Sequence, residues 1–300
     1  METAAEPRPA ELPLAGGRPG ATVALHPLLT GRMSGAPGWF LRSEGRLAGR
    51  RAVGIGVAKR DMLDVPVSAF LVEHPGAGLV LIDTGFHPSV AVSPRQNLGR
   101  VGLFAYKDVQ MDPAQAVSAQ LRERGKSPAD VRVVVMTHLH PDHASAIAEY
   151  PDATFVISKP EWEAATESGR MSGYVRRQFD HAFDYRLLDF DAPDASSFAG
   201  FGRSFDLFGD GSVRTVFTPG HTLGHMSVVL RAKAREVLVA GDAIYLRETL
   251  DTSQLPYRME DEHLFRRSLR ELAQYRKETP DALIIPGKDW DAWQELDTEY

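Results

Sequence analysis

The pattern of apolar and polar positions divides the chain into strands that alternate with a few helices. Two strands, at 67–74 (VSAFLVEH) and 78–85 (GLVLIDTG), are separated by Pro-Gly-Ala-Gly, which is typical of a hairpin turn. The run at 131–136 (VRVVVM) is too short for a helix and too apolar for a solvated strand, so it predicts a buried strand. Further strands are expected at 154–158, 212–218, 236–241 and 281–287.

Two amphipathic helices are expected between these strands. One spans 112–125, where Asp112 can cap its first turn. The other spans 262–277 and carries an apolar stripe, with acidic residues at its start and basic residues at its end, as the helix dipole favours. A short helix is also expected to run through Trp162. Because strands and helices alternate without a second autonomous core, the pattern favours one α/β domain.

Two segments differ in composition from the rest of the chain. Residues 1–20 contain four prolines and acidic residues where a signal peptide would need a basic end and an apolar stretch. We therefore expect a flexible leader, followed by a single domain over 21–300. The stretch 162–208 holds ten of the 26 aromatic residues, which fits either a lid over a pocket or ordinary core packing.

Composition narrows the classes of function. The absence of cysteine excludes disulfides, thiolate nucleophiles and thiolate metal ligands. A net charge of -6 offers no basic surface for nucleic acid, and no segment approaches the roughly 20 apolar residues that cross a bilayer. We expect a cytoplasmic protein that acts on a small molecule, and the pattern does not choose between a monomer and a homodimer.

Histidine and aspartate side chains gather directly after three of the predicted strands. The motif HLHPDH follows the buried strand, and alternation places its first two histidines on one side of an extended segment. Imidazole and carboxylate groups suit zinc, iron or manganese where sulfur is absent. Ligands at several strand ends imply one shared edge of the sheet, where open α/β sheets generally build their sites. The candidate ligands are His138, His140, Asp142, His143, His221 and Asp242.

The motif HLHPDH matches letter for letter the HxHxDH hallmark of the metallo-β-lactamase superfamily, and the chain resembles that superfamily from about 65 to 290. The resemblance implies an αββα sandwich of two similar halves, with one or two zinc ions at one edge of the sheets. Asp83, in LIDTG, is implied to brace the metal loops without binding metal. The implied ligands are His138, His140 and His221 for the first ion, Asp142 and His143 for the second, and Asp242 as the bridge.

Within the superfamily, VSAFLVEHPGAGLVLIDTG, TPGHTLGHMS and GDAIY resemble the N-acyl-homoserine lactonase group, which is known for quorum quenching. The implied reaction is hydrolysis of a lactone or a related ester, in which metal-bound hydroxide attacks the carbonyl. Asp142 would orient the water and pass a proton to the leaving oxygen, and Tyr245 would hold the substrate carbonyl. Trp39 and Phe40 would accommodate an acyl chain.

The chain departs from the family pattern at its last ligand. Where the family has a histidine in a GHD turn, this chain reads IIPGKD, with Lys288 in the place of the histidine. A protonated lysine is repelled by metal ions, so it must lose its proton, become carboxylated, swing away, or replace the second ion as the positive group that polarises the substrate. We expect a complete first site and a weaker or vacant second one. Lys288 is therefore a candidate catalytic residue beside Asp142 and Tyr245.

Two other functions remain open at this point. The first is a mononuclear iron redox enzyme of the same superfamily, similar to the persulfide dioxygenases. The second is a catalytically silent protein that keeps the pocket and binds a ligand without turnover. Metal content and oxygen uptake would separate the first from a hydrolase, and binding without turnover would identify the second.

Overall fold

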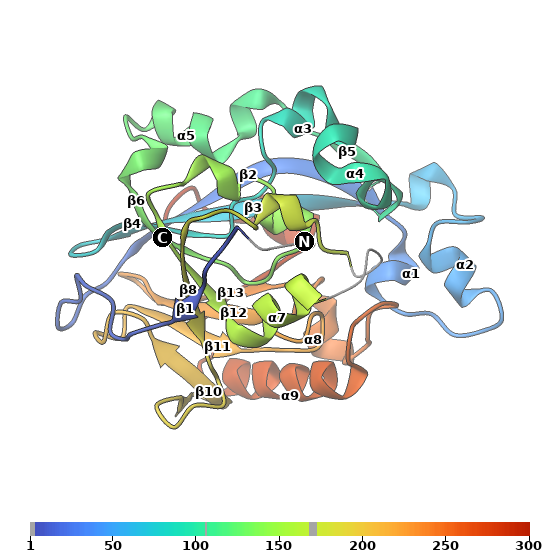
Figure 1. Cartoon of the computed structure of the whole chain (residues 1–300). Helices are drawn as coiled ribbons and strands as arrows, with labels where there is room; N and C mark the ends of the chain where they lie inside the picture. The colour runs from blue at the N-terminus through green and yellow to red at the C-terminus, as the bar shows by residue number, and fades with distance from the viewer. Residues whose placement is uncertain (1–3, 106, 168–172) are drawn as a thin grey trace.

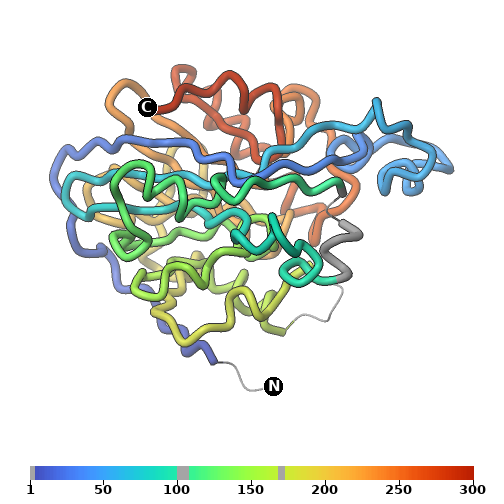
Figure 2. Tube along the Cα trace, turned by 90° about the horizontal axis from the view of Figure 1, so that it is seen from above, coloured from blue at the N-terminus to red at the C-terminus, as the bar shows by residue number. Residues whose placement is uncertain are grey.

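The computed structural model describes residues 4–105, 107–167 and 173–300. These residues form two β-sheets that lie face to face, with helices on the outer face of each sheet (Figure 1). This arrangement is the αββα sandwich that the sequence predicts. Seen from above (Figure 2), the segment of residues 36–62 projects from one end of the sandwich.

Each sheet contains strands from several parts of the chain. Within the described residues, the first sheet has eight strands in the order β1 (Arg8–Pro9), β8 (Asp184–Leu188), β7 (Thr154–Ser158), β6 (Val131–Val135), β4 (Gly78–Ile82), β3 (Leu63–His74), β2 (Ala24–Gly35) and β5 (Lys107–Gln110). The second has six, in the order β14 (Leu283–Pro286), β13 (Glu236–Gly241), β12 (Met226–Arg231), β11 (Val213–Phe217), β10 (Phe201–Asp206) and β9 (Ser196–Phe198).

The helices are short, apart from one long helix against the second sheet. The α-helices of the described residues are α1 (Pro37–Phe40), α2 (Ala48–Ala52), α3 (Ser89–Val92), α4 (Pro94–Ala105), α5 (Val117–Glu123), α6 (Pro141–Ala144), α7 (Lys159–Glu167), α8 (Glu248–Thr252), α9 (Glu262–Glu278) and α10 (Trp290–Gln294). Short 3-10 helices lie at Lys59–Asp61, Pro113–Gln115, Pro128–Asp130, Ile147–Glu149 and Arg176–Gln178. In the part of the chain described, every helix is too short or too polar to cross a membrane.

The central strands are apolar on both faces because each sheet is covered on both sides. Alternation along β6 sends Val133 and Val135 into the core between the sheets, while Val134 packs on the outer face. In β13, Val237 and Val239 meet that same inner core, and Leu238 packs outward against α9. The period of two therefore fixes the register of both sheets, since a slip of one residue would exchange the two faces.

The outer faces are closed by amphipathic helices. Val117 and Leu121 of α5 pack with outward residues of the first sheet. Phe265, Leu269 and Leu272 of α9 form the predicted stripe and cover the outer face of the second sheet. Asp261 caps α9 by accepting a hydrogen bond from the backbone N–H of Leu264.

The helix expected over 112–125 is shorter than the sequence suggests. Asp112 does cap a turn, but this turn is a 3-10 helix that ends before Ala116, whose ψ of 139° is extended. The α-helix proper, α5, starts at Val117. The single expected helix is therefore two short elements separated by one extended residue.

The leader expected to be flexible follows an ordered course over residues 4–20. Arg8 and Pro9 form β1, which pairs in parallel with β8, and Ala5 is buried. Pro9 is compatible with this place because an edge strand does not need every backbone N–H. Both residues of β1 are exposed, and the segment is anchored by Ala10, Leu12 and Leu14, which follow β1 and pack against the core between the sheets. Residues 1–3 lie outside the described residues.

Most aromatic residues of the stretch 162–208 belong to the core. Trp162, Phe179 and Tyr185 pack with the outer face of the first sheet. Phe190 stacks on Phe217 in the core between the sheets, with ring centroids 4.7 Å apart. Core packing therefore accounts for most of this stretch, although residues 168–172 lie outside the described residues.

The core between the sheets should dominate stability. Leu230 on β12 is 0% exposed, so Leu230→Ala should lower the free energy of unfolding by about 2–5 kcal/mol through lost burial and a residual cavity. Leu47 is 52% exposed, and Leu47→Ala should change it by less than about 0.5 kcal/mol. Urea denaturation of both variants tests this difference. Equal effects of the two substitutions would contradict the assigned core.

Candidate metal centre

The candidate ligands meet at one edge because the strands before them run the same way. In the first sheet β4, β6 and β7 are parallel, and in the second β13 is parallel to β14. β11 and β13 are each antiparallel to β12, so they also run in one direction. The loops that follow these strands therefore lie together at the carboxyl end of the sandwich.

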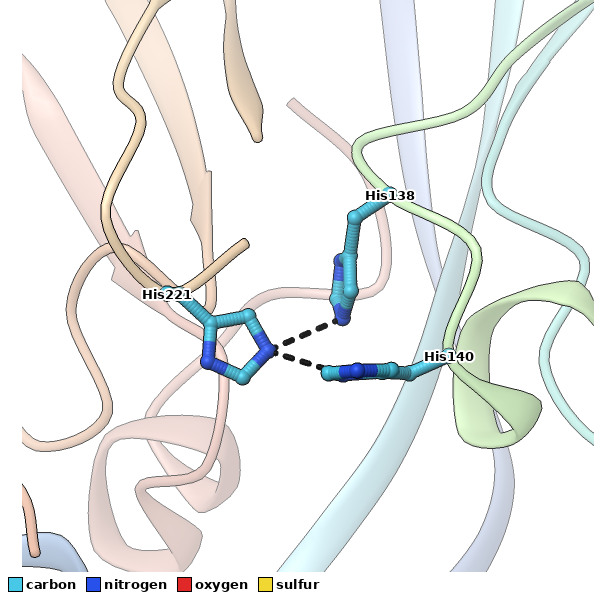
Figure 3. Close-up of side chains that lie close together, drawn as sticks. All are labelled: His138, His140 and His221. Atoms are coloured by element: carbon cyan, nitrogen blue, oxygen red, sulfur yellow. Dashed lines mark hydrogen bonds between the residues drawn. The ribbon is translucent and has the colours of Figure 1, made fainter. Parts of the chain in front are cut away.

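Three histidines converge on one point. His140 Nδ1 lies 3.0 Å from His221 Nε2, which lies 3.2 Å from His138 Nε2 (Figure 3). One ring nitrogen cannot make a good hydrogen bond to two other imidazoles at once, whereas ligands of a tetrahedral zinc ion lie about 3.3 Å apart when each Zn–N bond is about 2.0–2.1 Å. The three rings therefore fit a divalent ion held between them.

Burial keeps these histidines in the form that binds metal. It lowers the pKa of His140 to about 4, and it holds the pKa values of His138 and His221 well below the ordinary value. A neutral imidazole offers a lone pair, whereas a protonated one does not. The site is therefore prepared for a cation at neutral pH without the cost of removing protons.

Asp242 faces two neighbouring places. Its Oδ2 lies 3.3 Å from His221 Nε2 and 3.9 Å from His138 Nε2, on the side of the three histidines. Its Oδ1 lies 3.3 Å from His143 Nε2, on the other side. This orientation suits the predicted bridging role, with one carboxylate oxygen toward each place.

Lys288 fills the second of these places. Its Nζ lies 2.6 Å from Asp142 Oδ2, 2.9 Å from His143 Nε2 and 3.1 Å from Asp242 Oδ1. Burial alone would lower the pKa of Lys288, but the carboxylates of Asp142 and Asp242 raise it above its ordinary value. A second ion held by these donors would occupy the position of the Nζ. The donors of the second site therefore do not fit a metal ion while Lys288 lies among them.

Asp83 braces the loop that carries the motif, as the sequence predicts. Its carboxylate accepts hydrogen bonds from the backbone N–H and the hydroxyl of Thr137, both at 2.7 Å. It also lies 2.7 Å from His143 Nδ1, which orients that ring. Burial alone would lower the pKa of His143, but the carboxylates of Asp142, Asp83 and Asp242 raise it well above its ordinary value.

Glu161, which is not predicted from the sequence, connects the loop that carries His138 and His140 to the loop that carries His221. Its Oε1 accepts a hydrogen bond from the backbone N–H of Leu139 at 2.8 Å, and its Oε2 accepts one from the Thr222 hydroxyl at 2.6 Å. Burial raises the pKa of Glu161 to about 7, although both hydrogen bonds oppose the rise. Glu161 lies in the first turn of α7, directly after β7, just as the other site residues follow strands. A single glutamate in the first turn of a helix is common because it interacts favourably with the helix dipole, so the sequence alone does not mark it as a site residue.

Two tyrosines contact the ligands. The Tyr245 hydroxyl lies 2.9 Å from His221 Nδ1, and burial raises the pKa of Tyr245 well above its ordinary value, so the hydroxyl stays protonated. The Tyr174 ring lies 5.1 Å from that of His140. Tyr174 is therefore one aromatic residue of the stretch 162–208 that lies beside the centre, as expected if part of this stretch forms the wall of a pocket.

Three further histidine and aspartate residues, close in sequence to the site residues or to α9, have structural roles. His225 Nε2 accepts a hydrogen bond from the backbone N–H of Asp242 at 3.0 Å, so it positions that carboxylate. Asp289 caps α10 and accepts from the backbone N–H of Arg247. His263 is exposed in the first turn of α9.

Comparison with known proteins gives the same family as the motif. The model of the metallo-beta-lactamase superfamily matches residues 62–288. The N-acyl homoserine lactonase AttM of Rhizobium radiobacter is 34% identical over 234 residues, which cover 77% of this chain and 84% of that protein. The probable metallo-hydrolase Rv2300c of Mycobacterium tuberculosis is also 34% identical over 234 residues, covering 72% and 73%.

Solved structures share the fold. An N-acyl homoserine lactone hydrolase with the product N-hexanoyl-L-homoserine bound at its catalytic metal centre superposes with a TM-score of 0.72 at 21% identity, over 92% of this chain and 97% of that one. A quorum-quenching N-acyl homoserine lactone lactonase gives a TM-score of 0.71 at 19% identity, over 95% and 98%. The αββα architecture is therefore confirmed.

The three histidines should act as one ligand set. His221→Ala removes the nitrogen that both other rings approach, so zinc affinity should fall by roughly 100-fold or more. The exposed His263 provides a matched control, since His263→Ala leaves the centre intact. Elemental analysis after dialysis against a weak chelator measures the difference. Equal zinc content in the parent and in both variants would contradict this ligand set.

Glu161 should make stability depend on pH. The pKa of Glu161 in the folded state is raised from 4.5 to about 7. The stabilisation that its carboxyl group gives the folded state is therefore fully present below pH 4.5 and is lost as the pH rises through about 7. The loss is on the order of 3 kcal/mol. Glu161→Gln should therefore remove this part of the decline between pH 4.5 and 7.5, as measured by urea denaturation at a series of pH values. Parallel pH profiles for the parent and the variant would show that the carboxyl group is not the cause.

Proposed function

Because this chain belongs to the metallo-beta-lactamase superfamily, we propose that it is a metal-dependent hydrolase that opens an N-acyl-homoserine lactone or cleaves a closely related ester. The observation that carries the proposal is the convergence of three imidazole nitrogens beside the Tyr245 hydroxyl. The similarity to lactonases over most of the chain supports the lactone as substrate.

His138, His140 and His221 are proposed to hold one zinc ion. Nitrogen and oxygen donors in this number suit zinc, and neutral imidazoles are available at neutral pH. When bound, such an ion supplies a Lewis acid that makes water a nucleophile near pH 7. The chain supplies the ligands, the orientation of the reactants and a site largely closed to bulk solvent.

Asp142 is proposed to orient the attacking water. Burial alone would raise its pKa, but Lys288 and His143 hold the pKa of Asp142 well below its usual range, so it stays ionised. An ionised carboxylate accepts a hydrogen bond from water and fixes the direction of its lone pair. Because a low pKa makes Asp142 a poor proton donor, its proposed role is to orient the water.

Tyr245 is proposed to bind the substrate carbonyl. If His221 Nε2 is the ligand atom, His221 Nδ1 would carry the ring hydrogen and donate a hydrogen bond to the Tyr245 oxygen. The hydroxyl hydrogen of Tyr245 is then available to the oxygen on which negative charge develops. The same hydrogen bond holds the His221 ring in its binding orientation.

Aromatic side chains near Tyr245 are proposed to contact the acyl chain. The Phe40 ring meets the Tyr245 ring edge to face, with centroids 5.5 Å apart. Trp39 lies beside Tyr257, with ring centroids 6.1 Å apart, and Tyr257 is 40% exposed. These rings offer an apolar surface next to the reacting carbonyl, which is what an acylated lactone needs.

The test is hydrolysis of a series of N-acyl-homoserine lactones by zinc-loaded protein. Ring opening consumes water and yields the N-acyl-homoserine, which is detected by mass spectrometry and by acid release. Turnover of the lactones at rates above those of simple aryl esters would support the proposal. Tight binding without turnover would instead identify a silent ligand-binding protein, and oxygen uptake with iron would identify a redox enzyme.

Tyr245→Phe tests the carbonyl role directly. Loss of one donor to a developing oxyanion should lower kcat/KM for the lactone by about 100-fold at saturating zinc. Loss of the hydrogen bond to His221 should also weaken zinc binding by about 10-fold or more, so zinc content is measured in the same samples. Tyr275→Phe is a matched control, since its hydroxyl is bonded to Glu236, remote from the centre. An unchanged kcat/KM in Tyr245→Phe would remove this residue from the mechanism.

A further inference from the structure

The second place of the centre has donors that are typical of a metal site but contains an amine. Asp142, His143 and Asp242 all direct polar atoms to it, and all three are buried. The atom that lies within 3.1 Å of each of them is Lys288 Nζ. This combination needs a physical explanation, because two carboxylates close together in a dry site repel one another unless a cation lies between them.

We propose that Lys288 permanently replaces a second metal ion, so that the centre binds one divalent ion and carries its other positive charge on the chain itself. The surroundings suit an ammonium group: one of its N–H bonds donates to Asp142 Oδ2, and Asp242 Oδ1 and His143 Nε2 also lie within 3.1 Å of Nζ. Asp242 then joins the two cations, with Oδ2 toward the three histidines and Oδ1 toward Lys288.

Charge balance agrees with this assignment. One divalent ion and one ammonium against two carboxylates leave the centre with one net positive charge before hydroxide forms. A second divalent ion added to the same set would bring the total to three, with the ammonium and the ion within contact distance of each other. The ammonium therefore excludes the second ion by charge as well as by space.

The backbone holds Lys288 in this place. The N–H groups of Gly287 and Lys288 donate hydrogen bonds to the carbonyl oxygens of Ile244 and Tyr245, at 2.8 and 3.0 Å. A Cβ on Gly287 would lie 2.6 Å from the Gly241 carbonyl oxygen and 2.7 Å from Asp242 Oδ1, so glycine is required for this close approach. Lys288 is only 3% exposed, so it is a buried residue with defined partners.

The arrangement also limits what Lys288 can do in catalysis, and this step rests on the proposed function. Lys288 Nζ donates a hydrogen bond to Asp142 and forms an ion pair with Asp242, so buried protein groups hold the ammonium in place. Lys288 is thus a positioning residue that fixes Asp142 and Asp242, and the carbonyl depends on the zinc ion and Tyr245. The count of metal ions does not depend on the substrate.

The test is a titration of metal-free full-length protein with Co²⁺ alone, followed by the visible absorption of the bound ion and by elemental analysis. The parent should saturate at one ion per chain. Lys288→His and Lys288→Met remove the ammonium, and a second ion should bind to each at least 100-fold more tightly than to the parent. Lys288→Arg keeps the positive charge and should stay at one ion.

Lys159→His is the matched control, because Lys159 is an exposed lysine paired with a single carboxylate, Asp189. It should bind one ion, as the parent does. Circular dichroism tests whether each variant is folded. If Lys288→His does not fold, Lys288→Met provides the same test of the second site. Two ions of similar affinity in the parent would overturn the proposal, and so would a single ion in the parent and in every folded variant.

The outcome also separates this inference from the proposed function. A parent that binds one Co²⁺ and variants that bind two, with no lactone hydrolysis, would leave Lys288 as the second cation and remove the lactonase activity. A parent that binds no ion would overturn both. Hydrolysis by a parent that binds two ions would support the function and overturn the replacement.

Discussion

The structure of the centre depends on the cost of burying two carboxylates together. Asp142 and Asp242 are both almost fully buried, and each approaches Lys288. Charges removed from water must be paired, or they neutralise by taking up protons. The polar loops at this edge therefore need positive charge beside these carboxylates. On one side of Asp242, three histidines are placed to hold a metal ion, and on the other side lies the amine of Lys288.

The loops hold these groups because each one is tied to a neighbour by a buried acceptor. Asp83 fixes Thr137 and His143, Glu161 joins the loop at Leu139 to the loop at Thr222, and His225 holds the backbone of Asp242. None of these three side chains is needed as a ligand in the proposed site. They convert flexible connections between two rigid sheets into fixed positions, which is what an ion requires of its ligands.

Much of the fold follows from the sequence because the central strands are predominantly apolar and the helices α5 and α9 have clear apolar stripes. The candidate ligands are also predictable, since HLHPDH, His221 and Asp242 stand directly after strands. The ordered course of residues 4–20 was not predictable, because it depends on contacts with β8 far along the chain. Glu161 was missed for a similar reason: its partners lie 22 and 61 residues away. For Lys288 the sequence shows the departure from the family, while only the geometry shows that the amine lies among three acceptors.

An internal amine changes what such a centre can do. A second metal ion can bind a substrate oxygen by exchanging a ligand, whereas an ammonium group has no coordination position to exchange. Polarisation of the carbonyl then depends on one ion and on the Tyr245 hydroxyl, which is itself oriented through His221. The amine in turn needs no supply of metal and cannot dissociate. One of the two cations of the proposed centre is therefore part of the covalent chain, and the reactivity of the centre depends on a single exchangeable ion.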